Sequence, residues 1–265
     1  MNSTQMSKGT RRRQKILQKL KQQGRITVQE IIETMGCSEA TARRDLDVLE
    51  RQGELVRTIG GALFEGPSPM KEIPFAEKKN QLWFEKEAIA KKAAELIEEG
   101  DSICLSGGTT TYLIAKEIKK RQGITVVTNA VNIAMELADS EALQVVVIGG
   151  VMRSNTFELS GPLAEKTIEH LNIRKLFLGI DGLRIDKGIT TYSELEAATA
   201  RMMMKRAEQT LAVFDHSKVG KASLFSIAGL QELSACITDR ALDPETDRQL
   251  HHFGTKVYIA QPSGH

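Results

Sequence analysis

The stretch that decides the fold of the amino-terminal part reads TVQEIIETMGCSEATARRDLDVLERQGELVRTIGG and covers residues 27–61. Thr27 and Glu30 have the spacing of a capping box, in which each side chain satisfies a free backbone donor at the start of a helix. The helix that follows has Ile31 on its apolar side. We expect it to end at Gly36, because glycine readily takes the left-handed conformation found just after a helix.

A second helix is predicted after a tight turn. Ser38 is a suitable N-cap for this helix, and Gly53 is a suitable residue to end it. Within it, Ala42, Leu46 and Leu49 recur at steps of four and three residues. This spacing predicts one buried stripe along the helix.

Another face of the second helix carries polar and basic side chains. Ser38 and Thr41 place hydroxyls near its amino terminus, and Arg43 and Arg44 place guanidinium groups in its first two turns. Such groups bind phosphate oxygens and base edges. Two short helices with this layout are typical of a helix-turn-helix DNA reader. A solvated charged helix would show the same two arginines, but the caps and the turn favour DNA binding.

The next segment, ELVRTIGGALF at residues 54–64, has two short apolar runs separated by Gly60 and Gly61. Paired glycines supply the positive φ of a tight hairpin turn, so we expect a β-wing that carries Arg57 towards the DNA backbone. An ordinary hairpin is the alternative interpretation.

A further helix is predicted over residues 10–23, after a disordered polar tail at residues 1–9. Arg11, Arg12 and Arg13 crowd its first turn, where positive charge opposes the helix dipole. Two interpretations of these arginines stay open, contact with DNA phosphates or a solvated face. Residues 1–66 hold 12 Lys+Arg and 8 Asp+Glu (net +4), whereas the remainder holds 24 and 26 (net −2). The positive part is the one with the DNA-reading motif, as phosphate binding requires.

These residues resemble the amino-terminal pattern of the DeoR-type bacterial transcriptional repressors, which is close to S-x-x-T-(I/V)-R-R-D-L, then a leucine, a glycine and an R-x-x-G-G-A wing. The departure is Ala42, at a position usually given to a larger β-branched residue, which leaves the DNA-facing positions intact. The matching residues are Ser38, Thr41, Arg43, Arg44, Asp45, Leu46, Leu49, Gly53, Arg57, Gly60, Gly61 and Ala62. The predicted DNA contacts are Ser38, Thr41, Arg43, Arg44, Arg57, Gly60 and Gly61.

The composition is that of an ordinary soluble protein, with 41% hydrophobic and 26% charged residues. A chain of 265 residues has room for a small domain and a larger one. The three cysteines are far apart and lack metal-ligand spacing, so we expect no metal site, no disulfide framework and buried thiols in a reducing cytosol. Neither a signal peptide nor a membrane-spanning segment is evident, which predicts a cytoplasmic protein without a membrane partner.

Three prolines between residues 66 and 74 predict a linker between a DNA-binding domain at 10–65 and a larger domain at 75–265. Residues 75–99 are expected to form one long helix. Beyond it, short apolar runs alternate with helical segments, which is typical of an α/β fold with a mostly parallel sheet covered on both faces. The predicted strands are 102–105, 124–128, 143–149, 176–181, 210–215, 235–239 and 256–260, and the predicted helices are 109–120, 131–139, 162–170, 193–207 and 244–251.

Ligands of such sheets bind at the carboxyl ends of the strands. The first strand is followed by SGGTT, whose glycines let backbone N–H groups approach an anion at a helix start. It is neither a Walker loop nor a dinucleotide fingerprint, and an ordinary strand-to-helix turn is the alternative. Asn129, Gly150 and Asp181 follow later strands, as do Asp215 and Lys218, which could also simply pair with each other. Together these groups match a small anion with hydroxyls, such as a sugar phosphate.

The carboxyl-terminal part is similar to the sensor domain of the DeoR-type repressors, which looks like ribose-5-phosphate isomerase and binds a phosphorylated sugar-derived effector. Two departures are Ser106, where the family usually has Asp, and His216, where it usually has Ser. Because the first removes a carboxylate, the effector of a relative cannot be assumed here. The matching segments are 106–110, 128–129, 181–182, 188–191, 196–197 and 215–218. The predicted effector contacts are Ser106, Gly107, Gly108, Thr109, Thr110, Asn129, Gly150, Asp181, Glu196, Asp215 and Lys218.

The sequence therefore predicts a repressor of a carbohydrate-utilisation operon, a homo-oligomer (dimer or tetramer) that binds double-stranded operator DNA and is released by a phosphorylated sugar. We expect no cofactor and no catalytic residue. One alternative is a sugar-phosphate isomerase with a DNA-binding head. In that enzyme, acid–base carboxylates cluster around Asp-Gly-Ala-Asp, and Arg184 stands here where the second carboxylate belongs. The other alternative is architectural DNA binding without an effector.

Overall fold

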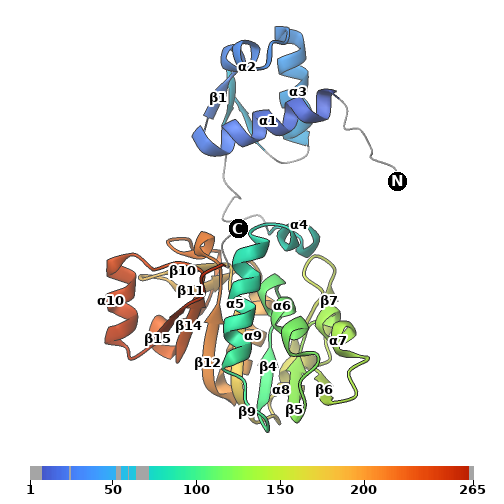
Figure 1. The fold of residues 1–265 in the computed structure, drawn as a ribbon, viewed down its shortest axis with the longest axis vertical. Helices are drawn as coiled ribbons and strands as arrows, with labels where there is room; N and C mark the ends of the chain where they lie inside the picture. The colour runs from blue at the N-terminus through green and yellow to red at the C-terminus, as the bar shows by residue number, and fades with distance from the viewer. Residues whose placement is uncertain (1–7, 24, 52–54, 59, 64–71, 263–265) are drawn as a thin grey trace. The chain divides into compact units, whose positions relative to one another are not determined.

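The computed structural model describes residues 8–23, 25–51, 55–58, 60–63 and 72–262. The chain divides into two compact units, Met1–Ser68 and Pro69–His265 (Figure 1). The predicted linker lies mostly outside the described residues.

The first unit is a three-helix domain with a small antiparallel sheet in the strand order β1-β3-β2. Its apolar core is formed by residues of all three helices, including Ile16, Ile31 and Leu46, each fully buried. The elements are α1 (Lys8–Gln23), β1 (Arg25–Thr27), α2 (Val28–Met35), α3 (Glu39–Arg51), β2 (Val56–Thr58) and β3 (Gly61–Leu63).

The predicted start and end of α2 and the predicted start of α3 are confirmed. Thr27 and Glu30 form the capping box, and Gly36 ends α2 in the left-handed conformation (φ 60°, ψ 39°). Ser38 caps α3, since its Oγ accepts from the Thr41 N–H at 3.3 Å. Helix α1 begins at Lys8, two residues before the predicted start, and residues 1–7 and Gly53 lie outside the described residues.

The role predicted for the paired glycines is wrong for Gly61. Gly61 does not have a positive φ; instead it pairs with Thr27 of β1, a strand that the sequence did not reveal. A Cβ on Gly61 would lie 2.1 Å from the Ile26 carbonyl oxygen. Glycine is therefore needed here for the close approach of two backbones. A Cβ on Gly60 would meet nothing within 4 Å.

The second unit is built on a seven-stranded parallel sheet in the order β15-β14-β12-β9-β4-β5-β6. All seven strands were predicted, because buried parallel strands are continuous apolar runs. Their bounds are β4 (Ser102–Leu105), β5 (Ile124–Thr128), β6 (Leu143–Val147), β9 (Ile173–Gly179), β12 (Ala207–Val213), β14 (Ala235–Thr238) and β15 (Lys256–Ile259).

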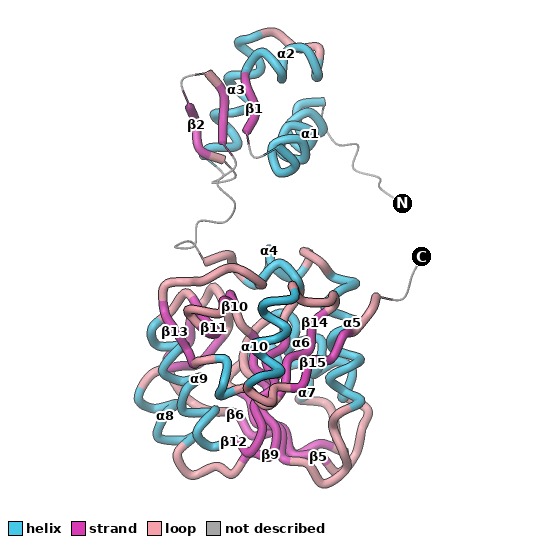
Figure 2. The backbone as a smooth tube through the Cα atoms, turned by 90° about the vertical axis from the view of Figure 1, so that its left-hand side faces the viewer, coloured by secondary structure: helices cyan, strands magenta, loops and turns pink. Residues whose placement is uncertain are grey.

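Helices cover both faces of this sheet (Figure 2). Residues of α5, α6 and α7 form one apolar core with the sheet, and residues of α8, α9 and α10 form a second core on its other face. The helices are α4 (Phe75–Lys79), α5 (Trp83–Glu95), α6 (Thr109–Ile118), α7 (Val131–Leu137), α8 (Pro162–Ile168), α9 (Glu194–Arg206) and α10 (Pro244–His252), with short 3-10 helices at His216–Lys218 and Leu230–Glu232.

The single helix predicted over residues 75–99 is wrong, because it is broken into α4 and α5. Leu82 has a left-handed backbone (φ 50°) at the start of α5. The Lys86 ammonium donates to the carbonyls of Lys78 and Gln81, both at 2.7 Å, and so satisfies acceptors freed at the break. The sequence also missed β7 (Val151–Arg153), β8 (Glu158–Ser160), β10 (Gly182–Arg184), β11 (Gly188–Thr191) and β13 (Phe225–Ala228).

Candidate functional site

The predicted DNA-reading face of α3 is largely open. Ser38, Arg43 and Arg44 are exposed and Thr41 is half-buried. Arg43 pairs with Glu39 one turn earlier, at 2.7 Å. Among the described residues, Arg44 makes no ion pair or hydrogen bond, and its side chain is exposed.

The arginines at the start of α1 have a role that neither interpretation considered. Arg12 and Arg13 form ion pairs with Asp45 of α3, whose carboxylate is only 4% exposed. The pairs join the first and third helices and compensate a buried charge. Of the three arginines, Arg11 is the exposed one.

Arg57 lies across the wing. Its Nη1 donates to the Gly61 carbonyl at 2.8 Å, and its Nε lies 3.2 Å from the Asp47 carboxylate. The side chain is therefore held within the domain. Gly60 is exposed at the turn and Gly61 is buried beside β1.

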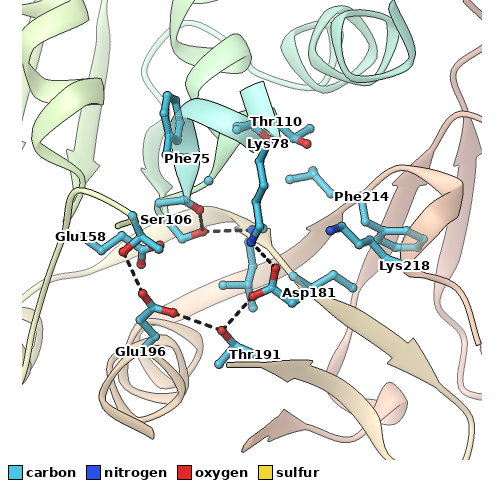
Figure 3. A pocket seen from close by; sticks show the side chains of 18 of the residues that line it. Phe75, Lys78, Ser106, Thr110, Glu158, Asp181, Thr191, Glu196, Phe214 and Lys218 are labelled. Atoms are coloured by element: carbon cyan, nitrogen blue, oxygen red, sulfur yellow. Dashed lines mark hydrogen bonds and ion pairs between the residues drawn. The ribbon is translucent and has the colours of Figure 1, made fainter. Parts of the chain in front are cut away.

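A pocket opens in the second unit at the carboxyl ends of the central strands β12, β9, β4 and β5 (Figure 3). The tertiary structure brings together there ten of the eleven predicted effector contacts: Ser106, Gly107, Gly108, Thr109, Thr110, Asn129, Asp181, Glu196, Asp215 and Lys218.

Gly150 is the exception and does not line the pocket. A Cβ at this position, where φ is 143°, would lie 2.8 Å from the backbone N and O of Ser160. Gly150 therefore permits the close approach of the β7–β8 hairpin, which is a structural role. His216 also points elsewhere, because its Nδ1 lies 2.7 Å from the Asp239 carboxylate.

The glycine loop after β4 combines fixed and free groups. Ser106 is fixed, since its hydroxyl accepts from the Gly179 N–H at 3.0 Å and donates to the Gly107 carbonyl at 3.1 Å. The hydroxyls of Thr109 and Thr110, in the first turn of α6, have no partner among the described residues. Together with the helix terminus they can donate to an anion.

Four carboxylates line the pocket, those of Glu158, Asp181, Glu196 and Asp215. The Thr191 hydroxyl lies 3.2 Å from both the Asp181 and the Glu196 carboxylates (Figure 3). Burial raises the pKa of Glu196, although Arg153 opposes this by pairing with it. Burial would also raise the pKa of Asp181, but Lys78 and Lys218 outweigh it and the pKa is lowered.

Two lysines of the pocket, Lys78 and Lys218, differ in whether they pair with a carboxylate. Lys78 pairs with Asp181 at 2.7 Å, which ties α4 to the end of β9. Lys218 pairs with no carboxylate among the described residues, and burial lowers its pKa. Asp215 accepts from the Ser217 N–H at 3.0 Å instead of pairing with Lys218.

Sequence reasoning missed Lys78, Lys86, Glu158 and Thr191. The first two lie in the segment predicted as one continuous helix, and Glu158 lies in a short hairpin with no strong strand pattern. Thr191 had a signal, because it belongs to the matched segment 188–191, but it was not assigned to the site.

The described residues contain neither a cluster suited to a metal ion nor a membrane-spanning helix. No group of three or more His, Cys, Asp or Glu side chains among them could hold a metal ion. Within the same residues, no helix combines the length and the apolar character needed to cross a membrane.

Comparison with known proteins agrees with this division of roles. Residues 12–67 match the DeoR-like helix-turn-helix domain, and residues 83–240 match the DeoR C-terminal sensor domain. The chain is 37% identical to the lactose phosphotransferase system repressor of Streptococcus mutans, covering 86% of this chain and 91% of that one. It is 34% identical to the HTH-type transcriptional repressor GlcR of Bacillus subtilis, covering 85% and 86%.

Among solved structures, ribose 5-phosphate isomerase A of Methanocaldococcus jannaschii is a neighbour at 16% identity, with a TM-score of 0.38 and coverage of 51% of this chain and 53% of that one. Arg184 pairs with Asp186 and does not line the pocket.

Proposed function

Because the chain belongs to the DeoR family of helix-turn-helix transcriptional regulators, we propose that it represses an operon of sugar metabolism and leaves its operator when a phosphorylated sugar occupies the pocket. The relatives named above are transcriptional repressors, and one of them is named for a sugar transport system. The protein is a regulator and not an enzyme.

The observation that carries the proposal is the chemistry of the pocket. Two threonine hydroxyls at a helix start and Lys218, none of them paired within the described residues, suit a phosphate, and four carboxylates suit the hydroxyls of a sugar. These groups meet at the ends of adjacent parallel strands, where ligands of such sheets bind.

On the DNA side, we propose that α3 enters the major groove. Ser38 and Thr41 would contact the DNA near the helix start, with Arg43, Arg44 and the wing residues Arg57, Gly60 and Gly61 around them. A dimer or tetramer would present two such helices to half-sites about 10 bp apart or a multiple of that spacing. The effector releases the operator only if it binds more tightly to an arrangement of the heads that does not fit those half-sites.

The test pairs two measurements on the full chain. A DNA duplex is first selected from a random library, and its affinity is measured by gel shift for the wild type, for Arg44→Ala and for the control Arg240→Ala, an exposed arginine of the second unit. We expect Arg44→Ala to weaken DNA binding by roughly tenfold or more, since one arginine fork on a base is worth about 1–3 kcal/mol, and the control to leave it unchanged.

A thermal-shift screen over phosphorylated sugars provides the second measurement. A ligand that binds the folded state raises the unfolding temperature by mass action, and Arg44→Ala should not alter that rise. If no phosphorylated sugar raises it, the proposed effector class is wrong. If Arg44→Ala reduces DNA binding and effector binding equally, the two sites are not separate as proposed.

A further inference from the structure

Glu158 and Asp215 are the two pocket carboxylates without an ion pair among the described residues, and Asp215 accepts instead from the Ser217 N–H. Arg153 pairs with Glu196, and Lys78 pairs with Asp181. Among the described residues, Glu158 makes no ion pair, and the hydrogen bond it receives comes from the neutral amide of Asn129 at 3.3 Å. Glu158 is half-buried, and a carboxylate that is partly removed from water without a counter-charge is costly. Burial, followed by the negative charge of Glu196, accordingly raises the pKa of Glu158 well above its ordinary value.

Asn129, next to Glu158 in the pocket, provides a second hydrogen-bond acceptor that receives no hydrogen bond from the described residues, its side-chain oxygen Oδ1. Its side chain lines the pocket and is 1% exposed, and its Oδ1 is buried with no hydrogen-bond partner among the described residues. The amide orientation is fixed by its other end, because Nδ2 donates both to Glu158 and to the Leu159 carbonyl at 3.1 Å. A flipped amide would set its oxygen against two acceptors.

Two of the pocket carboxylates lie apart from Lys218. In Figure 3, Glu158 and Glu196 lie on one side of the Lys78–Asp181 pair, and Lys218 lies on the other. The topology explains this separation. Asn129 follows β5 and Lys218 follows β12, three strand positions away in the order β12-β9-β4-β5. At about 4.8 Å between neighbouring strands, the two ends are roughly 14 Å apart.

We infer that the ligand is a phosphorylated amino sugar with a free primary amine, whose ammonium group donates to the Glu158 carboxylate and to Asn129 Oδ1 while its phosphate lies towards Thr110 and Lys218. An ammonium group supplies both a counter-charge and three donors, which is enough for both acceptors. A hydroxyl supplies one donor and leaves the charge of Glu158 uncompensated. This inference rests on the proposed function, since it specifies the class of sugar phosphate.

The experiment is calorimetric titration of the full chain with matched sugar phosphates. Glucosamine 6-phosphate, N-acetylglucosamine 6-phosphate and glucose 6-phosphate differ in one substituent, and the galactose series provides the same three probes in a second stereochemistry. We expect the free amine to bind about tenfold or more tightly than the hydroxyl or the acetamide in at least one series, as for a hydrogen bond to a charged group.

The role of Glu158 in recognising the amine is tested with the variant Glu158→Gln. The matched control is Glu169→Gln, at an exposed helix end. Glu158→Gln should bring the amine and hydroxyl probes to within about threefold of each other, whereas Glu169→Gln should keep the full preference. Circular dichroism and thermal unfolding establish that each variant is folded. Titration of the wild-type chain with the three probes tests the preference for the amine independently of any variant.

The outcomes separate the two claims. Binding of sugar phosphates without a preference for the amine, or a preference that survives Glu158→Gln, overturns the inference and leaves the proposed function standing. Failure of every phosphorylated sugar to bind, with or without an amine, overturns the proposed function and the inference with it.

Discussion

Substituting the two wing glycines separately tests the account of the first unit, because the structure assigns them different environments. In Gly61→Ala the new Cβ would lie 2.1 Å from the Ile26 carbonyl oxygen and 2.7 Å from Thr27 Cα. Both are backbone atoms, so β1 and β3 must separate. In Gly60→Ala the new Cβ meets nothing within 4 Å.

The size of the destabilisation by Gly61→Ala follows from the contacts that are lost when β1 and β3 separate. Strands β1 and β3 are paired over three residue positions, from Arg25↔Leu63 to Thr27↔Gly61. Crowding of this kind costs about 1–3 kcal/mol, and each lost backbone hydrogen bond costs about 1 kcal/mol net. We expect Gly61→Ala to lower the free energy of opening of the first unit by about 2–4 kcal/mol. Gly60→Ala should change it by less than about 0.5 kcal/mol.

The assay is native-state hydrogen exchange of the full chain, read at amides of α1, α2 and α3, because exchange reports local opening free energies separately for each part of a structure. A gel shift should also show weakened DNA binding for Gly61→Ala, because its wing is displaced. Equal protection in the two variants would refute the assignment of Gly61 to a close backbone approach.

Two further predictions concern buried titratable groups of the second unit. Burial lowers the pKa of Lys86 from 10.5 to about 8, so between these pH values the unfolded chain binds more protons than the folded chain and stability rises with pH, by up to about 3 kcal/mol. Urea unfolding of wild type and Lys86→Met across this window should show that rise in the wild type alone, and parallel curves would contradict it. Burial also raises the pKa of Cys104 and of Cys236 to about 12, whereas Cys37 is half-exposed. Ellman's reagent at pH 8 should therefore label Cys37 quickly and the other two only after unfolding, and rapid labelling of three thiols in the native chain would show that the core is more open than described.

The amino-acid sequence by itself determined the features that depend on neighbours along the chain. The capping box of Thr27 and Glu30 and the left-handed Gly36 involve residues at most three or four positions apart, so spacing was enough to predict them. The seven parallel strands were predicted for a related reason. A strand buried on both faces is a continuous apolar run wherever it lies in the sheet.

Most of the candidate site was also predicted, and the reason is geometric. The carboxyl ends of parallel strands share one edge of the sheet, so residues after β4, β5, β9 and β12 had to meet even though the strand order was unknown. Ten of the eleven predicted residues, from Ser106 to Lys218, line that pocket.

Only the tertiary structure determines which ion pairs and close contacts each of these residues makes. The position of Glu158 depends on a hairpin of β7 and β8, and the pairs that neutralise Glu196 and Asp181 join residues more than 40 positions apart. In the same way, Gly61 is needed because β1 passes beside it, and Arg12 and Arg13 are engaged because Asp45 is buried opposite them. Such long-range pairings have no periodic signature in the sequence, because burial and the identity of the nearest charge are set only when distant segments pack together.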